Sequence, residues 1–386
     1  MMMSRVSLLL RLTRTIEKAP FGCLAPLCTL ALAVVFAPGA AQGGDPKHVT
    51  AQIEIYKKTD RFAGWPANNG ISVWGDEIVV GFVLGYHKEQ PGHTIDSKRP
   101  SPAMQARSLD GGKTWTIEPI HYIAGEHEAR ETSSLSEPLD FTTPNFAARL
   151  KGRHFFYSFD RCHSWDGPLK LPTFGRPALL ARTDYIVEGK HRLTAFVAAD
   201  KDGGGEGQPL CIRTTDGGRN WELVGWIGAQ PPAGYGYAIM PATVAVHDGY
   251  LSMIRRGGVF DGKKRWWIEA FLSPDEGRSW YMLDQPRIDN SGNPATLTRL
   301  KDGRIAMTYG WRRAPYGMRA RLSADEGQTW SSEFILRSDG MTWDLGYPRT
   351  VQRSDGHLVT VYYHNDHGQQ ERYLAATIWD PNKVED

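Results

Sequence analysis

Arginine, histidine and aspartate recur in the short polar segments that separate the apolar runs of this chain. The arginines are Arg176, Arg255, Arg256, Arg312, Arg313 and Arg349, and the segments 87–96, 160–163 and 364–367 add histidines and aspartates. A guanidinium group can bind a carboxylate or sulfate through two parallel hydrogen bonds. Histidine and aspartate can donate and accept the protons of acid–base catalysis. If the fold brings these segments together, they form a positively charged polar pocket, and an acidic sugar is its natural ligand.

Four octamers of one pattern indicate which elements position those segments. Each reads Ser/Thr-x-Asp-x-Gly-x-x-Trp, and they span residues 108–115, 214–221, 273–280 and 323–330. The Asp can accept hydrogen bonds from the backbone of its own turn, the Gly supplies a positive φ, and the Trp buries a large surface. The octamers are Asp-boxes, and through them the chain resembles the superfamily of sialidase-like β-propellers.

A second hairpin precedes the Asp-box in each repeat. In the clearest copies, apolar runs flank Asp248-Gly249, Asp302-Gly303 and Asp355-Gly356, which is the strongest short-range signal for a hairpin. Weaker copies turn at residues 74–76, 151–152 and 188–189. Six hairpins predict six units of four strands, of which the second and sixth lack an Asp-box, and residues 49–56 supply the strand that closes the ring. We therefore predict an all-β protein, a six-bladed β-propeller of four-stranded antiparallel blades, over residues 45–386.

This topology sorts the turns and loops onto two faces. The Asp-boxes and the Asp-Gly hairpins share one face. The starts of the first strands and the loops between second and third strands share the other, which carries the longer and less regular loops. Functional residues usually lie on such loops, because a rigid scaffold positions them. We expect the arginine, histidine and aspartate segments, including residues 160–163, to meet there.

The resemblance to sialidases implies roles for individual residues. Tyr347 precedes Asp355 by eight residues, the family's interval between its tyrosine nucleophile and the last Asp-Gly turn. Asp96 lies in the loop ahead of the first Asp-box and corresponds to the general acid, with His93 as an alternative. Arg255-Arg256 ends the strand that carries the second arginine of the family's carboxylate-binding triad, and we expect Arg256 to bind substrate. Arg312, Arg313 and Arg319 compete for the third position.

Two family positions hold residues of different chemistry. Trp65 stands where the first arginine belongs, and Met240 stands where the glutamate base belongs. Methionine is not a base, and a phenol with a pKa of about 10 needs a nearby base or cations to attack at neutral pH. The candidate bases are Asp344, Glu206 and His364. Further residues expected to contact the sugar are Arg176, Arg349, His87, His93 and Trp65.

The resemblance predicts an exported glycoside hydrolase of the exo-α-sialidase type that releases a terminal acidic sugar from glycans. Tyr347 would attack or stabilise the anomeric carbon, and Asp96 would protonate the leaving oxygen. A polysaccharide lyase remains an alternative, because Tyr and His can remove a proton beside a uronate carboxylate; His87, His93, His163 and His364 are its candidates. A non-catalytic glycan-binding propeller is the other alternative, which the missing glutamate and arginine favour.

Charge and the N-terminal segment indicate compartment and partners. The 386-residue chain has a formal net charge of +2, so we expect neither nucleic acid nor an anionic membrane as partner. A basic region precedes an apolar stretch at residues 24–36, which is too short to span a bilayer comfortably and is followed by small residues. We predict a signal peptide over residues 1–41 and a periplasmic or extracellular monomer that needs no cofactor or metal. Cys162 and Cys211 could form a disulfide there or remain buried thiols.

Overall fold

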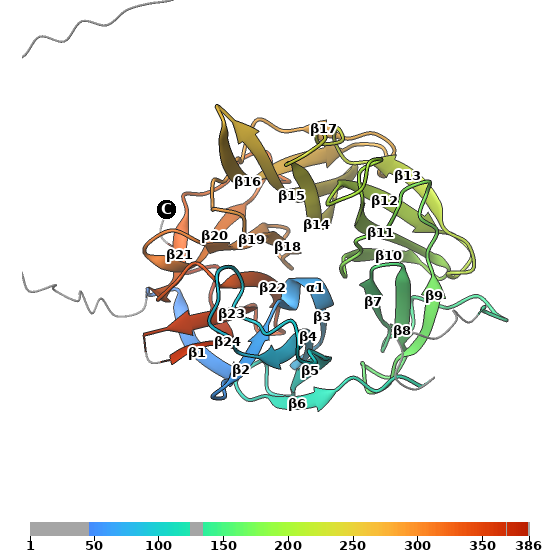
Figure 1. Cartoon of the computed structure of the whole chain (residues 1–386). Coiled ribbons are helices and arrows are strands. Elements are labelled where there is room, and N and C mark those ends of the chain that lie inside the picture. The colour runs from blue at the N-terminus through green and yellow to red at the C-terminus, as the bar shows by residue number, and fades with distance from the viewer. Residues whose placement is uncertain (1–45, 124–133, 368, 385–386) are drawn as a thin grey trace, which may run out of the picture. The chain divides into compact units, whose positions relative to one another are not determined.

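β-strands joined by tight turns make up nearly all of the computed structural model, which describes residues 46–123, 134–367 and 369–384. The strands form six antiparallel sheets arranged in a ring (Figure 1). The predicted six-bladed propeller is therefore confirmed. No helix in these described segments is long and apolar enough to cross a membrane. The signal peptide predicted over residues 1–41 lies outside them.

We number the blades 1 to 6 in chain order. Blade 1 consists of β2 (Arg61–Gly64), β3 (Ile71–Trp74), β4 (Glu77–Tyr86), β5 (Ala103–Ser108) and β6 (Thr116–Pro119). Blade 2 consists of β7 (Ala147–Lys151), β8 (His154–Ser158) and β9 (Asp166–Lys170). Blade 3 consists of β10 (Tyr185–Gly189), β11 (Arg192–Ala199), β12 (Gln208–Thr214) and β13 (Glu222–Trp226).

The second half of the ring has four strands in every blade. Blade 4 consists of β14 (Tyr237–Val246), β15 (Gly249–Phe260), β16 (Lys263–Ser273) and β17 (Tyr281–Met282). Blade 5 consists of β18 (Ala295–Arg299), β19 (Ile305–Trp311), β20 (Tyr316–Ser323) and β21 (Phe334–Gly340). Blade 6 consists of β22 (Gly346–Gln352), β23 (Leu358–Asp366), β24 (Gln369–Trp379) and the N-terminal strand β1 (Val49–Tyr56).

Strand β1 closes the ring as the sequence predicts. It pairs antiparallel with β24, from Val49 opposite Trp379 to Tyr56 opposite Leu374. Apolar side chains then fill the space between blades 6 and 1, among them Val80, Phe82 and Val361, all fully buried. Because the first and last strands share one sheet, the ring closes through backbone hydrogen bonds.

Three innermost strands share a backbone irregularity near one end. In blade 1 the short helix α1 (Pro66–Asn69) separates β2 from β3, and Trp65 before it has φ 60°. Strand β14 shifts register around Met240, which has φ 55°, and β22 shifts beside Tyr347, which has φ 51°. A left-handed conformation of a residue other than glycine costs roughly 1–3 kcal/mol and is concentrated at functional sites. These three positions therefore point to where the site lies.

The Asp-boxes form the turns that their sequence predicts. In the box of blade 4, Gly277 N donates to Ser273 Oγ at 2.8 Å, and Ser279 N donates to Asp275 Oδ1 at 2.8 Å. The indole of Trp280 donates to the carbonyl of Gly277 at 3.0 Å. The polar groups of this tight turn are therefore satisfied within the box itself.

Blade 2 contains a fifth Asp-box, so the prediction that it has none was wrong. Residues 158–165 show the same bonds: Cys162 N donates to Ser158 Oγ at 2.9 Å, and Ser164 N donates to Asp160 Oδ1 at 2.9 Å. Cys162, with φ 65°, replaces the glycine that defines the sequence pattern. Within the described residues this blade has three strands rather than the predicted four.

The fifth box also corrects the predicted position of residues 160–163. Arg161 Nη1 donates to Glu77 Oε2 at 2.9 Å, and Glu77 directly follows the β3–β4 turn on the Asp-box face. Asp160 and His163 therefore lie on the face opposite the irregular loops. The thiols of Cys162 and Cys211 are buried and free, and burial raises the pKa of each to about 12. The two cysteines do not form the disulfide that the sequence leaves open.

Candidate active site

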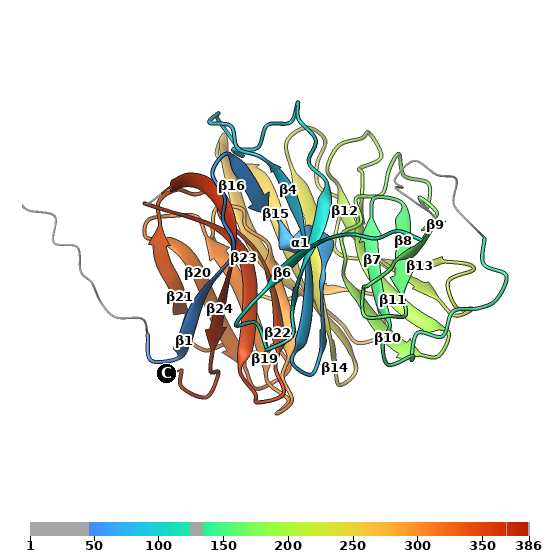
Figure 2. The ribbon, with the colours of Figure 1, turned by 90° about the horizontal axis from the view of Figure 1, so that it is seen from below.

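A cavity of about 550 Å³ opens on the face of the ring that carries the irregular loops. Figure 2 shows the loop between β4 and β5 projecting from this side, whereas the β14–β15 and β22–β23 turns lie on the opposite side. The cavity is lined by His93, Arg255, Trp266, Ser291, Gly292, Arg312, Tyr316 and Trp343. These residues come from blades 1, 4, 5 and 6, so the ring closure brings them together.

Tyr347 and Arg255 form the central contact beside this cavity. Arg255 Nη1 donates to the hydroxyl oxygen of Tyr347 at 2.8 Å and lies 3.6 Å from the sulfur of Met240. Burial lowers the pKa of Arg255, but nearby Tyr347, Tyr237 and Glu206 raise it above its ordinary value, so the guanidinium stays charged. A fixed cation at a phenol oxygen can stabilise negative charge on that oxygen.

The backbone at Tyr347 is held in its left-handed conformation by Asn293. The amide of Tyr347 donates to Asn293 Oδ1 at 3.0 Å, and Asn293 Nδ2 donates to the carbonyl of Leu345 at 2.8 Å. The preceding glycine, Gly346, has φ 102°, and a Cβ there would lie 2.3 Å from Asn293 Nδ2. Only glycine fits this approach, which fixes the direction of the tyrosine ring.

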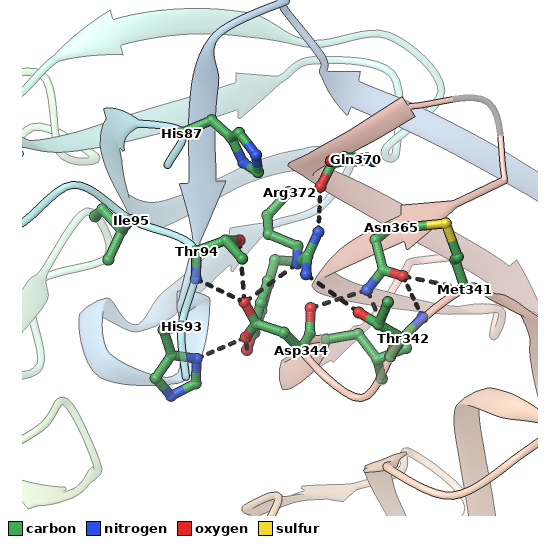
Figure 3. A network of polar contacts seen from close by, with 12 residues as sticks. His87, His93, Thr94, Ile95, Met341, Thr342, Asp344, Asn365, Gln370 and Arg372 are labelled. Atoms are coloured by element: carbon green, nitrogen blue, oxygen red, sulfur yellow. Dashed lines mark hydrogen bonds and ion pairs between the residues drawn. The ribbon is translucent and has the colours of Figure 1, made fainter. Parts of the chain in front are cut away.

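His93 and Asp344 form a histidine–carboxylate pair (Figure 3). His93 Nδ1 lies 2.6 Å from Asp344 Oδ1, and the side chain of Asp344 is 1% exposed. The same carboxylate accepts hydrogen bonds from Thr94 N at 3.2 Å, Tyr363 OH at 2.7 Å and Arg372 Nε at 3.2 Å. Burial raises the pKa of a carboxyl, but the hydrogen bond from His93 and the charges of His93 and Arg372 outweigh it and hold the pKa of Asp344 below its usual range.

The segment that carries Asp344 is fixed by a second network. Asn365 Oδ1 accepts hydrogen bonds from the amides of Met341 and Thr342 at 3.0 and 2.7 Å, and Asn365 Nδ2 donates to the carbonyl of Asp344 at 2.9 Å (Figure 3). The loop from blade 1 is therefore joined to a rigid segment of blade 6.

His93 faces the cavity among aromatic rings. Its ring centroid lies 6.4 Å from that of Tyr347 and 5.4 Å from those of Trp65 and Trp343. Its side chain is 33% exposed, and Nε2 has no hydrogen-bond partner among the described residues. Because Asp344 binds Nδ1, the free Nε2 can exchange a proton with a group in the cavity.

Two more arginines border the tyrosine. The guanidinium carbon of Arg312 lies 5.4 Å from the Tyr347 ring centroid, and Arg312 Nη2 donates to Tyr363 OH at 2.9 Å. Arg182, which no sequence motif marks, donates through Nε to Asn68 Oδ1 at 2.9 Å. Burial lowers the pKa of Arg182, and the neighbours that oppose this include Tyr347. Arg182 from blade 3 thus adds a cation near the place where Trp65 stands instead of arginine.

Some predicted residues lie away from the tyrosine. Arg256 Nη1 pairs with Glu269 at 2.8 Å, because consecutive residues of a strand point to opposite faces, and its neighbour Arg255 takes the position at Tyr347. Asp96 accepts a hydrogen bond from Lys98 N at 3.0 Å within its own loop. The remaining cationic candidates form ion pairs elsewhere: His87 with Glu89 at 3.7 Å, Arg313 with Asp289 at 2.7 Å, Arg349 with Asp184 at 3.9 Å, and Arg176 with Asp202.

The fold and the site define a sialidase-like six-bladed β-propeller. Residues 141–360, more than half of the chain, match the family described as "BNR repeat-like domain", and the chain belongs to that family. No curated protein matches the chain in sequence.

Several solved structures share the fold. A protein of unknown function from Dyadobacter fermentans is 21% identical with a TM-score of 0.64, over 86% of this chain and 98% of that one. An α-L-arabinanase from Penicillium chrysogenum is 14% identical with a TM-score of 0.56, over 87% and 99%. A K499G mutant of NanB sialidase from Streptococcus pneumoniae is 13% identical with a TM-score of 0.53, over 86% and 71%. At these identities the likeness concerns the fold, which glycoside hydrolases of different specificity share.

Proposed function

We propose that this protein is an exported, exo-acting glycoside hydrolase that releases a terminal acidic sugar from glycans. The observation that carries the proposal is the phenol of Tyr347, bound to Arg255 at 2.8 Å beside a cavity that His93 and Arg312 also line. The guanidinium groups of Arg255 and Arg312 supply positive charge for the acid group of the sugar. The fold is one that solved sialidases and arabinanases share.

The proposed reaction has two steps. In the first, Tyr347 attacks as the phenolate, its proton having passed to solvent and its charge being held by Arg255; its oxygen bonds to the anomeric carbon, the glycosidic C–O bond breaks, and His93 Nε2 gives its proton to the leaving oxygen. In the second, water attacks the anomeric carbon, the bond to Tyr347 breaks, and His93 takes the proton from the water. Asp344 keeps His93 in the required orientation and stabilises its charged form. His93 thus takes the general-acid role for which the resemblance to sialidases favours Asp96.

Hydrolysis of fluorogenic glycosides tests this proposal. The purified protein without residues 1–41 is assayed on aryl sialosides and on aryl glycosides of other acidic sugars. We expect turnover of an acidic glycoside, and we expect Tyr347→Phe to lower kcat by at least about 1,000-fold with the fold intact, because a nucleophile that acts with its partners accounts for most of the chemical step. Unchanged turnover in Tyr347→Phe would remove Tyr347 from the mechanism, whereas glycan binding by wild type without turnover of any glycoside would leave only a glycan-binding role. Cleavage of the exported protein after Ala41, determined by N-terminal sequencing, tests export.

A polysaccharide lyase is the second candidate, and one observation favours it. Among the described residues, the hydroxyl of Tyr347 has hydrogen-bond contact with Arg255 and with no carboxylate, since Met240 occupies the position of the family's base. A tyrosine, a histidine and an arginine can together remove a proton beside a uronate carboxylate and neutralise the charge. Elimination forms a C=C bond that absorbs in the ultraviolet. Absorbing ends from a uronate polymer, with acidic aryl glycosides untouched, would select the lyase.

A further inference from the structure

Strands β15 and β16 form a hairpin that is longer than those of the neighbouring blades. Their pairing runs from Tyr250 opposite Ser273 to Phe260 opposite Lys263. Strands β11 and β12 of blade 3, and β19 and β20 of blade 5, have only seven or eight residues each. At about 3.3 Å per residue, the hairpin extends roughly 10 Å further than its neighbours. Its turn joins the second strand of the blade to the third, so the extension lies on the face of the irregular loops, at the rim of the ring (Figure 1).

Every residue at the end of this hairpin, from 259 to 265, is exposed, and we call this segment the hairpin tip. Val259 and Phe260 are 49% and 48% exposed. They are followed by a turn at residues 261–262 and by the three consecutive cations of residues 263–265. Exposed apolar side chains beside clustered cations are typical of segments that bind an anionic surface at the boundary between lipid and water.

Carboxylates do not neutralise the cations of this region. Among the described residues, no ion pair involves the four exposed cationic side chains at and beside the tip, which are Lys263, Lys264, Arg265 and Arg287. Lys264 Nζ lies 4.4 Å from the ring centroid of Tyr235. The guanidinium carbon of Arg287 lies 4.6 Å from the ring centroid of Trp267. Contacts of this kind leave the positive charge in place, and Asp261 is the only acidic residue of the tip.

The apolar and the cationic side chains occupy both faces of the hairpin. Successive residues of a strand point to opposite faces, and residues directly opposite each other in an antiparallel pair share a face. Val259 therefore shares one face with Lys264, and Phe260 shares the other with Lys263. A glycan chain or a protein groove would contact one face of the hairpin, whereas a lipid interface surrounds a tip that enters it. The distribution on both faces favours a lipid surface as the partner.

The net charge of the chain does not show this local concentration of positive charge. A formal net charge of +2 gave no reason to expect an anionic membrane as partner. Charges at a surface act over only about 10 Å at ordinary ionic strength, so the distribution at the tip decides what binds there. Each lysine or arginine near an anionic bilayer raises the binding constant about fivefold.

We propose that the hairpin tip binds an anionic lipid surface, with Val259 and Phe260 in the interfacial region and the four cations at the level of the headgroups. The binding is peripheral and reversible, because two apolar side chains and a few charges give only marginal affinity. The same two strands carry Arg255 and Trp266, which line the active-site cavity, so docking holds that cavity close to the lipid surface. This last step rests on the proposed function and adds a substrate class to it, namely glycans attached to lipids.

Co-sedimentation with lipid vesicles tests the docking. The protein without residues 1–41 is mixed with vesicles of phosphatidylcholine alone, or of phosphatidylcholine with about 30% phosphatidylglycerol. We expect at least about 20-fold tighter binding to the anionic vesicles, and we expect most of this difference to be lost at about 0.5 M NaCl. The triple variant Lys263→Gln/Lys264→Gln/Arg265→Gln should weaken binding to anionic vesicles about 100-fold, and Phe260→Ser should weaken it about fivefold.

Matched variants separate the tip from the rest of the surface. Lys113→Gln/Lys190→Gln/Arg278→Gln removes three exposed cations from turns of the Asp-box face, and Leu109→Ser removes an apolar side chain there that is 72% exposed. Neither variant should alter vesicle binding. Lys263→Arg/Lys264→Arg keeps the charges of the tip and should bind as wild type does. Thermal melting checks that every variant is folded.

Equal binding of wild type and the triple variant to anionic vesicles overturns the proposal, as does equal binding of wild type to neutral and anionic vesicles. Binding of a soluble polyuronate that the triple variant loses, with no binding to vesicles, also overturns it, because the tip would then be a site for an acidic polysaccharide.

The substrate class is tested with one acidic sugar presented in two forms, on a lipid in anionic vesicles and as a soluble aryl glycoside. The triple variant should lower kcat/KM on the lipid-borne form at least about tenfold and leave the soluble form unchanged. Equal rates of the triple variant and wild type on the lipid-borne form would overturn this substrate class. Absence of turnover of both forms by wild type is a failure of the proposed function alone, because vesicle binding is measured without turnover.

Discussion

Replacing Asp344 with asparagine tests the proposed proton-donating role of His93. Asp344 Oδ1 accepts from His93 Nδ1 at 2.6 Å, and Oδ2 accepts from Arg372 Nε at 3.2 Å. An amide has one acceptor oxygen, so its NH₂ group must face one of these two donors. The substitution also removes the negative charge that favours the protonated imidazole. His93 should therefore lose both its orientation and its counter-charge.

The expected losses can be estimated from the burial of the pair. General acid catalysis contributes about 10²–10⁴-fold, so kcat/KM on a substrate with a poor leaving group should fall at least about 100-fold, or roughly 3 kcal/mol in activation free energy. Asp344 is 1% exposed, and leaving its cationic partners without a counter-charge should lower the free energy of unfolding by about 3 kcal/mol. Chemical denaturation measures the second quantity and shows whether the variant is folded during the assay.

Leaving groups of different acidity separate the chemical role from a structural one. An aryl leaving group of low pKa needs little protonation, so Asp344→Asn should slow its release much less than the release of an alkyl or sugar leaving group. Asp355→Asn is the matched control, since Asp355 lies 3.4 Å from His357 in the β22–β23 turn on the opposite face. It should change neither rate. An equal loss for good and poor leaving groups in a folded Asp344→Asn variant would refute the assignment of His93.

Three further outcomes are expected. Arg255→Met removes the charged hydrogen bond to Tyr347 and should lower kcat/KM on an acidic glycoside at least about 100-fold, whereas an equally active variant would remove Arg255 from the mechanism. In His364→Gln, the free energy of unfolding should depend less on pH than in wild type. Burial lowers the pKa of His364 to about 4, so wild type takes up a proton on unfolding between pH 4 and 6.5. The free energy of unfolding of wild type therefore falls by up to about 3 kcal/mol as the pH falls through that window. The same change in unfolding free energy between pH 4.5 and pH 7 in both proteins, measured by chemical denaturation, would contradict this. Asp275→Ala removes hydrogen bonds within the Asp-box of blade 4 and should lower the unfolding free energy by about 1–2 kcal/mol with activity unchanged; an unaltered melting temperature would show that the box adds nothing.

The ring could be predicted because its signals are local. Each Asp-box is eight consecutive residues whose hydrogen bonds close within the same turn, as those of Asp275 and Ser279 show. The fifth box escaped the pattern because Cys162 adopts a conformation that the pattern reserves for glycine. In the structure, the hydrogen bonds of Asp160 with Ser158 and Ser164 identify the turn.

The site could be predicted only in part, because its contacts join distant segments. The resemblance to sialidases points to Tyr347 through the family's interval to the next turn, but Asp344 meets His93 across 251 residues. Whether Arg255 or Arg256 contacts Tyr347 depends on the register of the strand. A shift of one residue turns each side chain to the opposite face, and the sequence does not determine the register to that precision. Arg182 lies outside any repeated motif and reaches the site through Asn68 in another blade. Pairings of this kind depend on how the ring closes.

The left-handed residues at Trp65, Met240 and Tyr347 have one more consequence. Their backbone geometry is set by bulges and by neighbours such as Asn293, whereas their side chains differ completely in chemistry. Each of these three backbone positions can therefore carry a different side chain without a change in the surrounding backbone. In this fold, substitutions at only three positions can change the reactivity of the site, while the blades around them stay the same.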